Sequence, residues 1–193
     1  MNNFTILKEH QRSKSTNESL SQLREAVGFV PNVYTAIASS DVALNAFMDM
    51  NTHFSNSLFS ETEKQIILLA TSTENECEYC VAGHTTFSKS LGIPKDLIDA
   101  MRDGRNLENK RLNVLNQFTR ALVRDRGRVS RQQVSEFFEA GYTQSNVIEI
   151  ILGISVKTFS NLTSILLEIP LDKSFETNAW CSNKSTVKKS IAA

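Results

Sequence analysis

The sequence predicts an all-α protein, and three observations support this class. Only 7 glycines and 3 prolines occur in 193 residues, so long stretches lack the residues that break helices. Apolar residues recur at helical spacing through most of the chain after residue 20. Two capping-box sequences, beginning at Ser60 and Ser130, mark helix starts. No two segments carry the alternation expected of a strand pair.

The helices are expected in a simple order, most of them closed by a glycine or opened by a cap. The expected segments are 20–27, a short one at 33–38, 41–53, one from Ser60 through the apolar run Ile66 to Ala70, 77–91, 94–103, 112–126, 130–140 and 143 to about 168. The apolar residues that mark the last one as a long, largely buried helix are Val147, Ile150, Ile151, Ile154, Leu162 and Ile165.

The domain organisation follows from where these signals begin and end. Residues 1–17 lack apolar periodicity and are expected to form a flexible arm. Residues 18–170 form one helical domain, long enough to bury a hydrophobic core. Residues 171–193 are expected to be a C-terminal tail of mixed composition.

Charge and hydropathy restrict the partners. Acidic and basic residues number 21 each, which gives no basic surface for nucleic acid or an anionic membrane. The first fifteen residues lack the apolar segment of a secretory signal. The apolar stretch from Val147 to Val156 contains Glu149 and is too short to cross a bilayer. We therefore expect a cytoplasmic protein without nucleic-acid or membrane partners.

The chemistry is expected at Cys77, Cys80 and His84. Their spacings are i,i+3, i,i+4 and i,i+7, which place all three side chains on one stripe of a helix. A free cysteine has a pKa of about 8.5 and is only about 3% thiolate at pH 7. The positive end of a helix N-terminus and a nearby histidine both favour the thiolate. Because His84 lies one turn from Cys80, we expect Cys80 to be the activated thiol and Cys77 its disulfide partner.

Other interpretations of these residues were weighed. Isolated cysteines and histidines are usually structural, and this is the preferred interpretation for Cys181, His10 and His53. A zinc site would need a further Cys/His pair at suitable spacing, and the sequence has none. Haem attachment needs a histidine directly after the second cysteine, where Val81 stands. We expect neither a metal nor a cofactor.

The segment Cys77-Glu78-Tyr79-Cys80-Val81-Ala82-Gly83-His84, with the helix before it, resembles the alkylhydroperoxidase D-like, or carboxymuconolactone decarboxylase, family. The resemblance is clearest over residues 60–92 and weaker at 28–32 and at the C-terminal helix. It implies an all-helical domain that assembles into trimers or hexamers and has its Cys-x-x-Cys at a helix N-terminus. It also implies thiol peroxidase or disulfide reductase activity.

In that family a glutamate on the preceding helix and the histidine relay protons to the second cysteine. Carried over by position, the glutamate falls on Gln65, and the family's second relay histidine falls on Tyr79. A glutamine cannot exchange a proton as a carboxylate does, so weak activity is expected. Glu63 lies two residues away, on another side of the helix, and is interpreted as part of the capping box. Gln65 and Tyr79 are kept as candidate site residues.

The leading hypothesis is therefore an antioxidant thiol peroxidase or disulfide reductase. Its substrate would be a peroxide or disulfide, and its electron donor an external thiol or a peroxiredoxin-like partner. The alternatives are a helical oligomeric binding module without turnover and a cofactor-free lactone decarboxylase. In the hypothesis that Gln65 only orients the imidazole, no carboxylate is required at that position.

Overall fold

The computed structural model describes residues 4–182, and all regular secondary structure in this range is helical. The order of elements is η1 (Glu9–Gln11), α1 (Lys14–Val27), α2 (Asn32–Ile37), α3 (Asp41–Ser55), α4 (Glu61–Glu74), α5 (Glu78–Ser90), α6 (Lys95–Asp103), α7 (Lys110–Arg124), α8 (Arg131–Glu139), α9 (Gln144–Leu166) and η2 (Glu176–Asn178). The predicted all-α class is confirmed.

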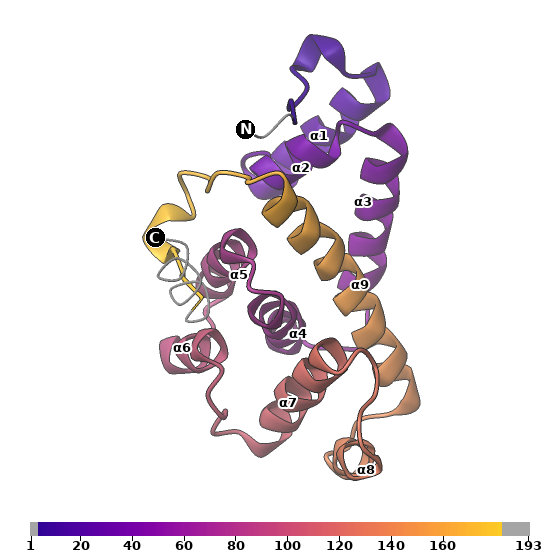
Figure 1. The fold of residues 1–193 in the computed structure, drawn as a ribbon, viewed down its shortest axis with the longest axis vertical. Helices are drawn as coiled ribbons and strands as arrows, with labels where there is room; N and C mark the ends of the chain where they lie inside the picture. The colour runs from indigo at the N-terminus through magenta and orange to yellow at the C-terminus, as the bar shows by residue number, and fades with distance from the viewer. Residues whose placement is uncertain (1–3, 183–193) are drawn as a thin grey trace, which may run out of the picture.

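Helix α4 is the centre of the fold, and α5, α6, α7 and α9 pack around it. In Figure 1 the helices α1, α2 and α3 lie at one end of the molecule, and α8 lies at the other end beside α7. The long helix α9 runs between these ends and contacts both α3 and α4. The segment from α4 to α5 and the middle of α9 therefore meet in the interior.

The sequence of α4 explains its central position. Ser60 caps the helix, and Glu63 returns a hydrogen bond to the Ser60 backbone, as expected for a capping box. Glu63 also binds Arg111 and Tyr142, so its side chain is held at the helix start. The run Ile66–Ala70 is buried on all sides, which is typical of a helix enclosed by others.

A three-residue link joins α4 to α5 and fixes where the cysteines lie. Glu76 in this link has a φ of 56°, a left-handed conformation that turns the chain sharply. Asn75 donates a hydrogen bond to the side chain of Asn161 on α9 over 2.9 Å. Cys77 is the N-cap of α5, so the expected helix start is correct to within one residue.

Both ends of the expected domain differ from the sequence-based boundaries. Helix α1 begins at Lys14, inside the expected arm, because the Ser13 hydroxyl accepts a hydrogen bond from the Thr16 amide and caps it. Beyond residue 170, Asp172 and Phe175 are buried, so the start of the expected tail is packed against the domain. Residues 1–3 and 183–193 of the arm and tail lie outside the described range.

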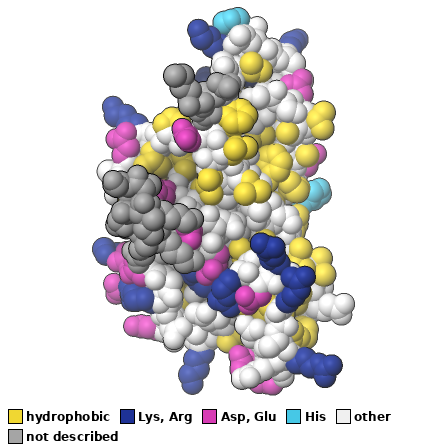
Figure 2. All heavy atoms as spheres, in the orientation of Figure 1, with side chains coloured by type: hydrophobic (Ala, Val, Ile, Leu, Met, Phe, Trp, Pro, Cys, Tyr) yellow, Lys and Arg dark blue, Asp and Glu magenta, His cyan; other side chains and the backbone are white. Residues whose placement is uncertain are grey.

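Helix α9 exists as predicted, but the prediction that it is largely buried was wrong about its apolar residues. Ile151, Leu162 and Ile165 are 45–61% exposed. The buried face carries the apolar Ile150 and Val156 together with small or polar residues, namely Gly153, Lys157, Ser160, Asn161 and Ser164. Hydrophobic side chains gather on the surface near α9 in Figure 2. The helical periodicity is confirmed, but Ile151, Leu162 and Ile165 face outward.

By length and composition alone, α9 would pass for a membrane span, with 23 residues and a mean hydropathy of 1.2 over its most apolar window. The helix is thus longer than the apolar stretch noted in the sequence. It packs against α2, α3, α4, α5 and α7. Core helices of water-soluble proteins have the same length and composition, so this feature is weak evidence for a span.

We predict that Gly153→Ala lowers the free energy of unfolding. A Cβ at this position would lie 2.5 Å from the Phe54 ring and 2.9 Å from Ile67. Overpacking of this kind costs about 1–3 kcal/mol, whereas the better helix propensity of alanine returns about 1 kcal/mol. Urea unfolding measures the difference. The control Ser155→Ala, on the exposed side of the same helix, should change stability by less than about 0.5 kcal/mol. A more stable Gly153→Ala protein would contradict this close packing.

Candidate active site

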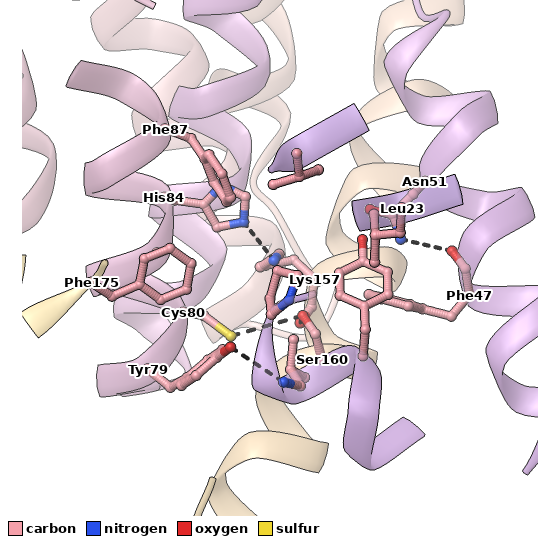
Figure 3. A pocket seen from close by; sticks show the side chains of 15 residues that line it. Leu23, Phe47, Asn51, Tyr79, Cys80, His84, Phe87, Lys157, Ser160 and Phe175 are labelled. Carbon is pink, nitrogen blue, oxygen red and sulfur yellow. Dashed lines mark hydrogen bonds between the residues drawn. The ribbon is translucent and has the colours of Figure 1, made fainter. Parts of the chain in front are cut away.

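A cavity of about 220 Å³ lies where α1, α2, α3, α5 and α9 meet in front of Cys80. Aromatic rings form much of its wall, and Cys80, His84 and Lys157 point into it (Figure 3). The aromatic lining residues are Tyr34, Phe47, Tyr79, Phe87 and Phe175. A small apolar molecule would therefore meet a thiol and a cation at the same end of this cavity.

The two cysteines lie at the start of α5 and are both buried. The Cys77 sulfur accepts a hydrogen bond from the Cys80 amide over 3.4 Å, which is the N-cap interaction of the helix. The Cys80 sulfur is 3.9 Å from the Ser160 hydroxyl and 3.8 Å from the Ser164 hydroxyl, both on α9. Cys77 borders a second cavity, of about 370 Å³, with Glu76, Glu78 and Glu168 in its lining.

The surroundings separate the two thiols in acidity. Burial raises the pKa of Cys80, but the hydrogen bond from Cys77, the charge of Lys157 and hydrogen bonds from Asn161 and Ser164 outweigh it and lower the pKa to about 6. The hydrogen bond with Cys80, burial and the negative charge of Cys80 raise the pKa of Cys77 far above its usual value. Cys80 is thus the thiolate at neutral pH, and Cys77 stays protonated.

Lys157, His84 and Gln65 form a hydrogen-bonded chain beside Cys80. The Lys157 ammonium is 2.6 Å from Nε2 of His84, and Nδ1 of His84 is 3.0 Å from the side-chain oxygen of Gln65. An ammonium only donates hydrogen bonds, so Nε2 accepts and the ring proton sits on Nδ1 and is donated to Gln65. Burial and the Lys157 charge hold the pKa of His84 well below its usual value. The imidazole is therefore neutral.

This chain changes the expected role of His84. From its spacing of one helical turn, we expected His84 to lie beside Cys80 and to favour the Cys80 thiolate. Both ring nitrogens instead bind Gln65 and Lys157, and no hydrogen bond joins His84 to Cys80 in the part of the chain that the structure describes. The positive charge next to Cys80 belongs to Lys157.

Tyr79 lines the cavity, but its hydroxyl is engaged elsewhere. It donates to the carboxylate of Asp172 over 2.5 Å and accepts from the Val33 amide over 3.2 Å. Burial and the hydrogen bond to Asp172 raise the pKa of Tyr79. Tyr34, from α2, also faces the cavity, and burial followed by the charge of Cys80 raises its pKa to about 12. Both phenols are neutral at physiological pH.

Sequence reasoning missed Lys157, although a signal was present. It is one charged residue within an apolar helix, and it shares a face with Gly153, Ser160, Asn161 and Ser164 at spacings of three and four. Small and polar residues on one face of an otherwise apolar helix indicate that this face meets a polar site.

The remaining candidates lie apart from this chemistry. Cys181 is an exposed free thiol in the tail, whereas Cys77 and Cys80 are buried. Among residues 4–182, no three His, Cys, Asp or Glu side chains are grouped so that they would hold a metal ion. The reactive groups of this cavity are therefore the two thiols, the amine and the imidazole.

Comparison with known proteins agrees with this arrangement. The profile of the carboxymuconolactone decarboxylase family matches residues 43–105, which include the link between α4 and α5 and both cysteines. No curated protein matches the chain.

Several solved structures share its fold at low identity. An alkylhydroperoxidase AhpD core protein, an uncharacterised peroxidase-related protein from Ralstonia eutropha JMP134, superimposes with a TM-score of 0.81 at 18% identity, covering 89% of this chain and 93% of the other. A peroxidase-related protein from Silicibacter sp. TM1040 gives 0.77 at 19%, covering 90% and 92%. The debrominase Bmp8, in complex with 2,3,4-tribromopyrrole, gives 0.77 at 14%, covering 90% and 94%.

The chain has the all-α fold of an alkylhydroperoxidase D-like structure, with its paired cysteines at the start of α5. Residues 43–105, around the paired cysteines, are similar to the carboxymuconolactone decarboxylase family.

We predict that alkylation of Cys80 by iodoacetamide rises with pH around a midpoint of about 6, because only the thiolate reacts. Cys77 should stay unreactive across the neutral range, since its pKa is raised. Mass-mapped peptides after timed alkylation give both profiles, with Cys80→Ser as the control. A Cys80 midpoint near that of a free thiol, about 8.5, would contradict this electrostatic description.

Proposed function

We propose that this protein is a thiol-dependent redox enzyme that reduces a peroxide at Cys80, with Cys77 as the resolving thiol. The observation that carries the proposal is the opposite shift of the two pKa values in one buried cysteine pair. A structural cysteine pair has no need of a thiolate facing a cavity. The activity is antioxidant in kind, and the reducing cytoplasm is the compartment that keeps such a dithiol reduced.

The chemistry proceeds in three balanced steps. The Cys80 thiolate attacks the terminal oxygen of a hydroperoxide, the O–O bond breaks, and Cys80 becomes a sulfenic acid while an alcohol leaves after taking one proton. The Cys77 thiol then displaces water from the sulfenic acid and forms the Cys77–Cys80 disulfide. An external dithiol returns two electrons and two protons and leaves as its own disulfide.

The second cavity supports Cys77 as the sulfur that the reductant attacks. Cys77 borders it, whereas Cys80 faces the aromatic cavity on the other side. The carboxylates of Glu76, Glu78 and Glu168 in its lining favour a neutral or cationic donor over an anionic one. The electron donor is an external thiol reductant or a peroxiredoxin-like partner. In disulfide reductase activity, the same cysteine pair would pass its electrons to the disulfide of a partner protein.

A second candidate is reductive dehalogenation of a small aromatic compound. The aromatic lining of the cavity favours it, and the debrominase Bmp8, which has a similar fold, was solved with 2,3,4-tribromopyrrole. The two thiols would supply the electrons, a hydrogen would replace the halogen, and halide would leave as the disulfide forms. Release of bromide from a bromopyrrole, measured beside peroxide consumption, distinguishes the two reactions.

The proposed function predicts that one equivalent of hydrogen peroxide converts the protein to a Cys77–Cys80 disulfide. Mass spectrometry should show the loss of two hydrogens, and peptide mapping should join these residues. Cys77→Ser should stop at the sulfenic acid, since the resolving thiol is gone. The control Cys181→Ser should behave as wild type. A disulfide that includes Cys181, or no oxidation at all, would reject the assignment, and the latter would favour a binding module without turnover.

We also propose that the protein is a homo-oligomer, a trimer or hexamer. The exposed apolar side chains on α9 support this, because large exposed apolar patches on a soluble protein commonly mark contacts with other chains. These side chains are Ile148, Ile151, Leu162, Ile165 and Leu166. Zero net charge does not oppose association.

Light scattering at micromolar concentration should therefore give a multiple of the 21.6 kDa chain mass. Leu162→Lys, a change at a 61% exposed position, should lower that mass without unfolding the chain. The control is Ser135→Lys, at an exposed position on α8 that is away from the apolar residues of α9. A wild-type mass equal to that of one chain would remove the support for this proposal.

A further inference from the structure

Lys157 is a buried cation that lacks a carboxylate partner. Its side chain is on α9, the residue is 7% exposed, and no salt bridge joins it to an acidic residue within the described range. A buried charge without a counter-charge is strongly unfavourable. The group that balances Lys157 must therefore be the Cys80 thiolate in the same cavity.

We propose that Lys157 is the acid–base residue of the thiol cycle: it pairs with the Cys80 thiolate as an ammonium and gives its proton to the oxygen that leaves the peroxide. This inference rests on the proposed function and adds to it a catalytic residue. It replaces the carboxylate–histidine relay that the family resemblance implies.

The proton balance of the cycle is simple. The thiolate, the ammonium and ROOH become a sulfenic acid, a neutral amine and ROH. The Cys77 thiol and the sulfenic acid then give the disulfide and water. When a dithiol reduces the disulfide, one of its protons goes to Cys77 and the other to the amine of Lys157, which restores the ion pair.

Electroneutrality favours Lys157 as the donor. Before the reaction, the thiolate and the ammonium cancel, and afterwards the sulfenic acid is neutral. If the proton came from elsewhere, the ammonium would remain buried with no anion, which is strongly unfavourable. Transfer from Lys157 removes both charges in the same step.

The other groups that face the cavity are poorer donors. Tyr34, from α2, has its pKa raised to about 12, and the Tyr79 hydroxyl already donates to Asp172. The one ring proton of His84 is donated to Gln65, away from Cys80. Gln65 itself, from α4, carries no titratable proton. Lys157 therefore remains as the proton-bearing cation that lines the same cavity as the thiol.

His84 and Gln65 act as positioning residues for the amine. Nε2 of His84 holds the Lys157 nitrogen at 2.6 Å, and Gln65 fixes the ring tautomer that leaves Nε2 free to accept. A glutamate at position 65 would accept the same hydrogen bond but would add a negative charge. That charge would hold Lys157 in its protonated form after the thiolate has gone.

Two substitutions of Lys157 separate its charge from its proton. Arginine keeps the positive charge but does not give up a proton in proteins, and methionine removes both. Alkylation of Cys80 by iodoacetamide needs only the Cys80 thiolate. A single turnover with cumene hydroperoxide needs the thiolate and also a proton for the leaving oxygen. Lys157→Arg should alkylate within about tenfold of wild type while peroxide reduction falls about 10²- to 10⁴-fold, the range of a lost general acid. Lys157→Met should lose about 10²-fold in alkylation at pH 7 as well, because the thiolate fraction falls.

The control is Lys64→Met, which removes a second buried lysine, on α4, that binds Glu61 and the Ser55 carbonyl. It should alkylate and reduce peroxide as wild type does. Equal losses in both assays for Lys157→Arg would mean that the variant is misfolded. The proposal is then tested by measuring proton uptake on the wild-type protein. Peroxide reduction by Lys157→Arg at the wild-type rate would overturn the proposal.

The proton count needs neither a variant nor a peroxide. Diamide, an azo oxidant that accepts two electrons and two protons, converts the reduced wild-type pair to the disulfide in weakly buffered solution at pH 7. If Lys157 supplies one of these protons and stays neutral, almost no protons are taken up from the solution. If Lys157 stays an ammonium, about one proton per disulfide is taken up from the solution. An uptake of one proton overturns the proposal. A protein that passes this count but does not reduce peroxide refutes the proposed function alone.

The Gln65→Glu variant provides the last test of the proposal. We expect its peroxide step to slow and its rate–pH profile to shift, while Gln65→Ala should mainly loosen the position of the amine. A faster Gln65→Glu enzyme would show that a carboxylate relay is the missing element and would overturn the assignment of the proton to Lys157.

Discussion

The cost of burying one lysine is the constraint on which the site depends. Lys157 lies on the inner face of α9, where its ammonium meets a thiol and an imidazole. Its charge is tolerated because Cys80 ionises, and the pKa of Cys80 is lowered first by the hydrogen bond from Cys77 and then by this charge. The groups around this pair are neutral. The histidine accepts a hydrogen bond from Lys157, the glutamine accepts one from the histidine, and the phenols of Tyr34 and Tyr79 stay protonated.

The fold supplies the rigid parts that this pair needs. Helix α4, which is buried from Glu63 to Ser72, carries Gln65, and the short link after it sets Cys77 as the cap of α5. The polar contacts between Asn75, Asn161 and Ser72 join that link to α9. As a result, three side chains from three helices meet within hydrogen-bonding distance, and the position of each is fixed by backbone packing rather than by a flexible loop.

Much of this could be predicted from the sequence, for reasons that lie in local chemistry. The cap at Ser60, the glycine stops and the helical spacing of Cys77, Cys80 and His84 depend on neighbours along the chain, and they appear in the structure as expected. The partner of His84 could not be found in this way, because Lys157 is 73 residues distant in sequence. The exposure of Ile151, Leu162 and Ile165 on α9 could not be predicted for the same reason, because burial is decided by helices that are distant in the sequence.

The two cysteines border different cavities, and this has a kinetic consequence. Under the proposed function, the molecule that oxidises Cys80 would enter among the aromatic rings, and the molecule that reduces the disulfide would meet Cys77 on the side that Glu78 and Glu168 line. The two reactants would then not compete for one space. In enzymes that alternate between two forms at a shared site, high concentrations of one substrate block the other. A dithiol site with two entrances escapes that mutual inhibition and can run with both reactants in excess.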